Sequence, residues 1–224
     1  MIRRDYLLRM IEEFMQALAR IRAAKQQKQW NQASGDLDTE FNRLIGSDCR
    51  TAQQMSETEL LARTVREEPT HLVRDKILMV ATLLKEAGDV ALARDRTSEW
   101  SACYLKSLHL LLDTLGGDEV FEHPDFVPKV HILVEALAGM GLPTRTHAML
   151  MQHFERTGEF AKAEDSLHAM LEAEPENSFI VEFGVVFYQR VLAQSDATLM
   201  AGSLPRPEVE EGLRELQLRQ ERSK

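Results

Sequence analysis

Two short segments of this chain share one order of residue types: a glycine, an acid, then mostly apolar residues that end in alanine. They are Gly88-Asp89-Val90-Ala91-Leu92-Ala93 and Gly158-Glu159-Phe160-Ala161-Lys162-Ala163. Glycine readily adopts the left-handed conformation that closes an α-helix, and an acid stabilises the electropositive start of the next helix. Each segment therefore predicts a helix end, a turn and a new helix.

The residues before each glycine are spaced like the buried face of a helix, at positions i, i+3, i+4 and i+7. They are Ile77, Val80, Ala81 and Leu84, and then His147, Leu150, Met151 and Phe154. Because this spacing aligns side chains on one side of an α-helix, both stretches predict amphipathic helices. The small Ala93 and Ala163 would then let two helices approach closely, so we expect two antiparallel helical hairpins.

The second hairpin resembles the tetratricopeptide repeat, a unit of about 34 residues with a glycine-acid-aromatic-x-x-alanine turn and a proline near its end. If the unit starts at Thr144, its matching positions are Leu150, Phe154, Gly158, Phe160, Ala163 and Pro175. The first copy, begun at Arg74, matches Val80, Ala81, Leu84, Gly88 and Ala93 but lacks the proline. Ile77, Trp100, His147 and Met170 depart from the family pattern. The resemblance therefore implies antiparallel helical hairpins stacked as an irregular tetratricopeptide-like right-handed array.

In that family, partners bind along a concave face formed by the first helix of each repeat. The corresponding positions here are Asp75, Leu78, Thr82 and Lys85, followed by Arg145, Ala148, Gln152 and Glu155. The resemblance thus implies a protein or peptide partner that contacts Thr82, Lys85, Arg145 and Gln152. The family's clamp for a C-terminal carboxylate is not supported, because Ala148 and Gln152 stand where Lys and Asn are needed. The alternative is an ordinary all-helical protein whose hairpins form no ligand groove.

A long N-terminal helix is expected from Asp5 to about Gln29. One apolar seam contains Leu7, Met10, Phe14, Ala17 and Ile21, and a second contains Leu8, Ile11, Met15 and Leu18. Two adjacent seams need partners on two sides, which predicts a homodimer through this helix. The alternative is that the helix caps the end of its own chain's stack. The opening run of residues 5–13, DYLLRMIEE, also resembles the start of an uncharacterised bacterial family, and that resemblance implies no activity.

Other helices are indicated by caps and breaks along the chain. A polar break is expected at residues 31–35, a short helix is ended by Gly46, and Ser56-Glu57-Thr58-Glu59 predicts a capped helix start. Further helices are expected after His123, over residues 179–194 and from about Glu208. We expect an N-terminal helical region at 1–69, the hairpins at 70–203, and a charged tail helix at 204–224. The tail has only a thin apolar stripe, so it is expected to be loosely held.

Composition and charge narrow the classes of partner. The 224 residues are 44% hydrophobic and 28% charged but only 6% aromatic, which favours helices over strands. The formal net charge of −9 makes nucleic acid an unexpected partner. Residues 1–30, with seven basic and three acidic residues, leave a regulator that contacts nucleic acid or an anionic membrane as a third hypothesis. The longest nearly apolar stretch, residues 77–84, is too short to span a bilayer, so no membrane partner is expected.

The sequence contains no recognisable catalytic constellation. His147 and His153 are six residues apart and do not converge on one helix face, so no metal site is expected there or at His168. Cys49 and Cys103 lack a CxxC spacing, which fits a reducing cytoplasm and suggests neither zinc nor a disulfide. We therefore expect a cytoplasmic interaction module without cofactor. The alternative is an enzyme whose site is assembled from distant helices, which histidines or acids gathered in one pocket would support.

Overall fold

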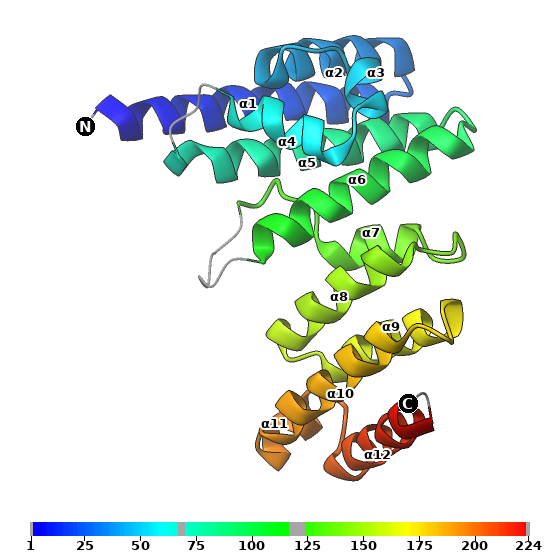
Figure 1. The fold of residues 1–224 in the computed structure, drawn as a ribbon. Helices are drawn as coiled ribbons and strands as arrows, with labels where there is room; N and C mark the ends of the chain where they lie inside the picture. The colour runs from blue at the N-terminus through cyan, green and yellow to red at the C-terminus, as the bar shows by residue number, and fades with distance from the viewer. Residues whose placement is uncertain (1, 67–69, 117–123, 223–224) are drawn as a thin grey trace. The chain divides into compact units, whose positions relative to one another are not determined.

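The computed structural model describes residues 2–66, 70–116 and 124–222 (Figure 1). These residues contain twelve α-helices and no strand, which confirms the all-α class and the packing of helices as hairpins. Within the same residues, none of the helices combines the length and apolar character needed to cross a membrane.

Contacts divide the chain into two compact units, Met1–Gly141 and Leu142–Lys224, which we call unit 1 and unit 2. Unit 1 contains α1 (Ile2–Gln26), α2 (Trp30–Ile45), α3 (Cys49–Gln54), α4 (Glu57–Val65), α5 (Thr70–Leu92), α6 (Thr97–Leu115) and α7 (Val130–Ala136). Unit 2 contains α8 (Thr144–Thr157), α9 (Phe160–Ala173), α10 (Ser178–Leu192), α11 (Asp196–Ala201) and α12 (Arg206–Arg222). This division differs from the expected boundaries after residues 69 and 203, because α2 and α4 pack on α5 while α12 packs on α10.

The inner seam of α1 forms part of the core of unit 1. Met10, Phe14, Ala17 and Ile21 are all buried where α1 packs on α2 and α5. The expected polar break at residues 31–35 is wrong, because α2 runs from Trp30 straight through this segment. Its polar residues lie on the outer face, while Ala33 continues the buried stripe of Leu37 and Phe41. Gly46 ends α2 with a φ of +65°, as expected.

The short helices α3 and α4 are fixed by caps and by one lysine. Ser56 and Glu59 form the predicted capping box at the start of α4. Lys106 of α6 donates hydrogen bonds to the backbone carbonyls of Gln53 and Met55, which lie at the end of α3. Because the last carbonyls of a helix lack partners within the helix, this lysine satisfies groups that would otherwise need water.

The hairpin α5–α6 is present, but its turn is not at the predicted place. Helix α5 continues through Gly88 to Leu92, and the turn follows at residues 93–96, so the predicted helix end at Gly88 is wrong. A Cβ atom built on Gly88 would lie 2.4 Å from the ring of Tyr104 in α6. The glycine is therefore needed for the close approach of two helices. Ala93, expected at the helix crossing, is exposed in the turn instead.

The hairpin α8–α9 matches its prediction closely. Helix α8 ends at Gly158, which has a φ of +76°, and α9 begins at Phe160. An L-residue rarely adopts this left-handed conformation, so the helix end is encoded locally by the glycine. Ala163 is fully buried in unit 2, in agreement with its expected place at the crossing.

The C-terminal helix α12 is packed, so the expectation of a loose tail is wrong. Val209 is fully buried and Leu216 is 6% exposed, and α12 lies against α10. Gly212 faces the ring of Tyr188, and a Cβ atom there would lie 2.4 Å from the ring. The thin stripe suffices because the helix approaches its neighbour closely.

Two expectations concern the segment before α7. His123, the expected start of a helix, lies outside the described residues. Helix α7 begins only at Val130 and ends at Ala136. Phe126, which precedes it, is buried against Phe14 of α1 with ring centroids 5.0 Å apart. This edge-to-face contact anchors the segment to the N-terminal helix.

Candidate functional site

A pocket of about 450 Å³ lies in unit 1 between α2, α3, α5 and the start of α6. Its lining residues are Ser34, Leu37, Asp38, Cys49, Arg50, Gln53, Ala87, Val90, Ala91, Arg94, Arg96 and Glu99. The volume falls within the range of about 300–1,000 Å³ that is typical of ligand sites. The turn between α5 and α6 supplies Arg94 and Arg96, so the longer path of α5 past Gly88 helps to shape this pocket.

The pocket is lined by three arginines, Arg50, Arg94 and Arg96. Arg94 donates a hydrogen bond of 2.7 Å from Nη2 to Oδ1 of Asn31, which ties the α5–α6 turn to the start of α2. Arg96 pairs with Glu99 at 3.1 Å. Among the described residues, neither Arg50 nor Arg94 forms an ion pair with a carboxylate. Their charges are therefore available to a ligand.

The acid and the thiol in the lining are already engaged. The Oδ1 atom of Asp38 accepts a hydrogen bond of 3.0 Å from the backbone amide of Cys49. Burial raises the pKa of the Cys49 thiol, and its Sγ accepts a weak hydrogen bond from Gln53 at 3.4 Å. A protonated thiol is a poor nucleophile, so this arrangement suits binding better than covalent catalysis.

A second hollow lies beside the pocket and shares Arg94 with it. Its lining residues are Lys28, Gln29, Trp30, Asn31, Gln32 and Arg94. Lys28 has a φ of +58°, and Asp95 in the neighbouring turn has a φ of +56°. Such conformations are uncommon for residues other than glycine and are often found at functional sites. Two unusual turns thus border the same cationic region.

A cluster of charges behind the pocket holds α1, α5 and α6 together. Glu86, which is almost completely buried, accepts hydrogen bonds from Arg22 and Lys25 of α1. Lys25 also pairs with Asp89, which accepts a hydrogen bond of 2.6 Å from the Tyr104 hydroxyl. Burial opposes the charge of Asp89, but the neighbouring lysines outweigh it and hold the pKa of this carboxyl below its ordinary value.

The structure does not bring the four predicted partner contacts together as a free surface. Thr82 is fully buried and donates a hydrogen bond of 2.8 Å to the carbonyl of Leu78, so it cannot touch a partner and this prediction is corrected. Lys85 is half-buried and pairs with Asp89 at 2.7 Å. The burial of Thr82 fits the wider core of unit 1, where α2 and α4 pack on α5, whereas the Lys85–Asp89 pair lies within α5.

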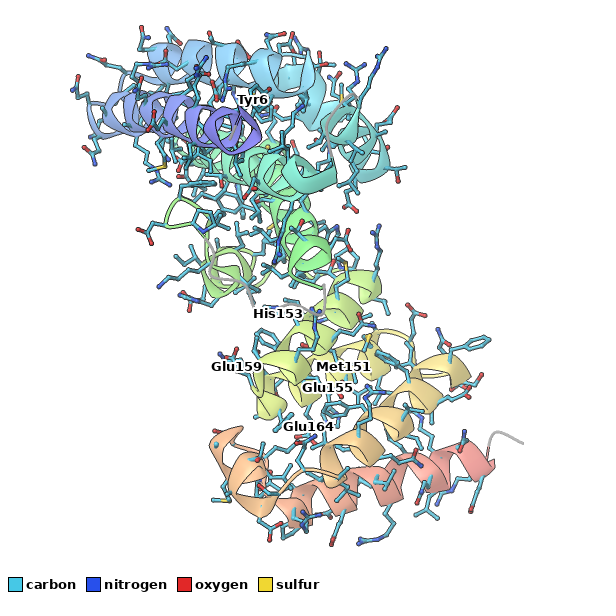
Figure 2. All side chains as sticks on the ribbon, turned by 90° about the vertical axis from the view of Figure 1, so that its left-hand side faces the viewer. Tyr6, Met151, His153, Glu155, Glu159 and Glu164 are labelled. Atoms are coloured by element: carbon cyan, nitrogen blue, oxygen red, sulfur yellow. The ribbon has the colours of Figure 1, made fainter. Side chains whose placement is uncertain are left out.

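The other two predicted contacts, Arg145 and Gln152, lie exposed on α8 in unit 2. On the same helix, Glu155 (labelled in Figure 2) forms a two-pronged ion pair with Arg190 of α10, with both N–O distances 2.7 Å. Glu164, also labelled there, accepts a hydrogen bond of 2.7 Å from the Tyr188 hydroxyl. These acids of unit 2 act in packing between helices.

The outer seam of α1 remains partly uncovered in unit 1. Tyr6 (Figure 2) and Leu8 are about half exposed, and Met15 is 40% exposed, whereas Leu18 of the same seam is buried. This leaves an apolar strip along one side of the N-terminal helix, of the kind that the sequence predicts for a second copy of the chain.

Sequence reasoning misses the pocket because its residues come from four helices. The one available signal is Arg94-Asp95-Arg96, a charged run that lies immediately after the apolar part of α5. Among the described residues, no histidine lines the pocket. Burial lowers the pKa of His147 in α8, and His153 lies beside the ring of Phe154. In the described part of the chain, no group of three or more His, Cys, Asp or Glu side chains is placed to hold a metal ion.

The fold and the site together define an all-α protein of packed helical hairpins with an arginine-lined pocket in its N-terminal unit. The model of a family of unknown function, DUF6483, matches residues 1–221, so the chain belongs to this family. No curated protein and no solved structure matches the chain.

Proposed function

We propose that this protein is an interaction module that binds a protein or peptide partner in the pocket of unit 1. The observation that carries the proposal is the combination of volume, apolar floor and arginine rim in one site between α2, α3, α5 and α6. Pockets that hold a ligand are typically apolar with a few well-placed polar groups. This location replaces the concave face inferred from the repeat resemblance.

The lining supports binding over the alternative of an enzyme. General acid–base catalysis needs a positioned group that exchanges a proton with the substrate. Among the described residues, no histidine lines this pocket, and its two acids are engaged, Asp38 by the backbone amide of Cys49 and Glu99 by Arg96. Arginine stays charged and serves to hold anionic or planar groups. The pocket therefore offers hydrogen-bond donors and an apolar surface for a ligand.

The hairpins are proposed to be tetratricopeptide-like in their local geometry. Support comes from α8 and α9, where Gly158 closes the first helix and buried Ala163 lies in the second. The right-handed stacking of such hairpins is part of the same proposal.

A position-specific photo-crosslinking experiment tests the proposed function. A photoreactive residue is placed at Ser34, which lines the pocket, and in a matched variant at Gln152, which is exposed on α8. The proposal predicts that the photoreactive residue at Ser34 forms a covalent adduct, with the same partner peptide in each independent lysate. The residue at Gln152 should form none. An adduct from Gln152 alone would place the partner on unit 2 instead, and no adduct from either position would remove the proposal.

Self-association through α1 is proposed as a second property of the module. The strip of Leu8 and Met15 gives an apolar surface that an identical helix could cover. Light scattering should show that Met15→Glu converts a dimer to a monomer, while Met140→Glu, at a side chain 41% exposed outside the helices, leaves the mass unchanged. A wild-type protein that is monomeric at high concentration would contradict this proposal.

A further inference from the structure

The charges of the unit 1 pocket are unbalanced in a direction opposite to the whole chain. The protein has a formal net charge of −9, yet the lining contains three arginines and only two acids. Glu99 pairs with Arg96, while Asp38 accepts a hydrogen bond from the neutral amide of Cys49 and keeps its negative charge. Arg50 and Arg94 are left as positive groups, and Lys28 adds another in the adjoining hollow.

With Lys28, Asp48 and Asp95 included, the region has four basic and four acidic side chains and is formally neutral. Asp48 uses its side chain to cap α3, accepting a hydrogen bond of 2.7 Å from the amide of Thr51. Asp95 is exposed in the turn between Arg94 and Arg96. The region around the pocket is therefore neutral overall, in contrast to the formal net charge of −9 of the whole chain, and its positive groups lie in the pocket lining and the adjoining hollow.

The floor of the pocket is apolar. Leu37 of α2 and Ala87, Val90 and Ala91 of α5 contribute to the lining, and each is at most 6% exposed. A bare anion would not use this surface. A ligand that satisfies both halves of the site carries an apolar group for the floor and an anionic group for the arginines.

The guanidinium group is well suited to a carboxylate. It presents five N–H donors in a planar fork, and two of them match the two oxygens of a carboxylate. Arg94 donates a hydrogen bond to Asn31, which holds the side chain in place and leaves other N–H donors for a ligand. Arg50 is exposed at the start of α3 and lines the same pocket.

We propose that the pocket binds an acidic segment of a partner protein in which a Glu or Asp follows a leucine-like residue. This inference rests on the proposed function and specifies the chemistry of the partner. The carboxylate pairs with Arg50 and Arg94, and the apolar side chain packs on Leu37 and Val90. The guanidinium groups of Arg50 and Arg94 favour an occupant that carries a carboxylate over one that is only apolar.

The chain provides its own reporter. It has two tryptophans, Trp30 and Trp100, and Trp30 lines the hollow that shares Arg94 with the pocket. The variant Trp100→Phe keeps an aromatic ring beside Tyr104 and leaves Trp30 as the single indole. Binding at Arg94 should therefore change the fluorescence of this variant.

The experiment titrates the Trp100→Phe protein with acetyl-Ala-Leu-Glu-Leu-Ala-amide and with the same peptide carrying Gln for Glu. We expect the acidic peptide to bind roughly tenfold or more tightly than the amide, with the difference reduced at high salt. The double change Arg50→Gln and Arg94→Gln should weaken the acidic peptide by at least roughly tenfold. The matched double change Arg9→Gln and Arg20→Gln, at exposed positions on α1, should leave binding unchanged.

Three results would overturn the inference. Equal binding of the two peptides would show that the carboxylate is not read, although the pocket could still hold a partner. Hexanoate binding as tightly as the acidic peptide would identify a small aliphatic acid as the occupant. If neither peptide binds, the acidic-segment inference is wrong. The proposed function is tested separately, by the adduct at Ser34. Circular dichroism melts of each variant are the control that separates a loss of binding from a loss of fold.

Discussion

The hairpins α5–α6 and α8–α9 contain the same motif of glycine, acid and apolar residues, but the motif has a different structure in each. In unit 2, Gly158 ends α8 in a left-handed conformation, and Glu159 makes local contacts with Thr157 and Lys162. In unit 1, Gly88 lies inside α5, and Asp89 is held by Lys25, Lys85 and the Tyr104 hydroxyl. The same local sequence therefore forms a turn in unit 2, where its contacts are local, and lies within a helix in unit 1, where neighbouring helices contact it.

The difference has a consequence for the site. Because α5 continues past Gly88 to Leu92, the turn that follows carries Arg94 and Arg96 to the edge of the pocket. The corresponding turn in unit 2 is short and lies at Gly158 itself. We therefore interpret α5–α6 as the hairpin that supports binding and α8–α9 as one that serves packing.

The largest contrast is expected from the two lysines that pair with these acids. Lys25→Met removes the cation that contacts both Glu86 and Asp89 and leaves buried negative charge, so we expect a loss of about 3 kcal/mol in the free energy of unfolding. Lys162→Met breaks only an exposed pair with Glu159 and should cost less than about 1 kcal/mol. Urea denaturation of both variants measures the difference. Equal losses would show that the unit 1 cluster is not buried as described.

The next contrast concerns Ala93 and Ala163, which lie at equivalent positions of the two motifs. Ala163→Leu overpacks a fully buried site between helices, and we expect a loss of about 2 kcal/mol. Ala93→Leu places its side chain in an exposed turn and should change stability by no more than about 0.5 kcal/mol. Thermal melts followed by circular dichroism provide the check, and an Ala163→Leu protein as stable as the wild type would argue against the crossing of α8 and α9.

Gly88 and Gly158 are required for different physical reasons, a close contact and a positive φ. Gly88→Ala brings a Cβ atom against Tyr104 and should cost about 1 to 2 kcal/mol, whereas Gly158→Ala places a side chain at a positive φ and should cost about 1 kcal/mol. The additional change Tyr104→Leu should remove most of the Gly88→Ala penalty and none of the Gly158→Ala penalty. Additive penalties in the Gly88–Tyr104 cycle would show that the ring is not what the glycine accommodates.

The smallest contrast is in pH dependence, because each unit has one carboxylate that accepts a tyrosine hydroxyl. Lysines lower the pKa of Asp89 in spite of burial, whereas burial raises the pKa of Glu164 in spite of the hydrogen bond from Tyr188. The stability due to Asp89 is present above its ordinary pKa of 3.8 and is lost as the pH falls through the lower folded value. The contribution of Glu164 is present below its ordinary pKa of 4.5 and is lost as the pH rises through the higher folded value.

Two variants separate these opposite contributions. As the pH falls from neutral to acidic, the wild type should lose stability relative to Asp89→Asn and gain stability relative to Glu164→Gln. Urea denaturation of the three proteins across this range measures both differences. Differences that run in the same direction would contradict the distinct environments of the two carboxylates.

The features that the sequence predicts correctly are those with local determinants. The end of α8 at Gly158, the capping box of Ser56 and Glu59, and the helix end at Gly46 each depend on residues within a few positions. The interior position of Gly88 depends on Tyr104 in the next helix, and the packed tail depends on Gly212 against Tyr188. Such close approaches are set by tertiary contacts, so periodicity alone does not reveal them.

The candidate site cannot be predicted from the sequence alone, because it too depends on tertiary contacts. The structure brings Arg50 of α3 beside the α5–α6 turn, and no spacing along the chain connects these residues. The repeat resemblance predicts Thr82 as a partner contact, but Thr82 is buried by the helices that cover α5. An arginine-bearing turn after a long apolar helix is visible in the sequence, but its partners are not.

Hydrogen–deuterium exchange with and without the acidic peptide tests most directly whether α5–α6 carries the binding site and α8–α9 does not. We predict slower exchange in α3 and in the α5–α6 turn around Arg94, with no change in α8 or α9. Protection confined to α8 or α9, or no protection near Arg94 at saturating peptide, would contradict the assignment of binding to unit 1.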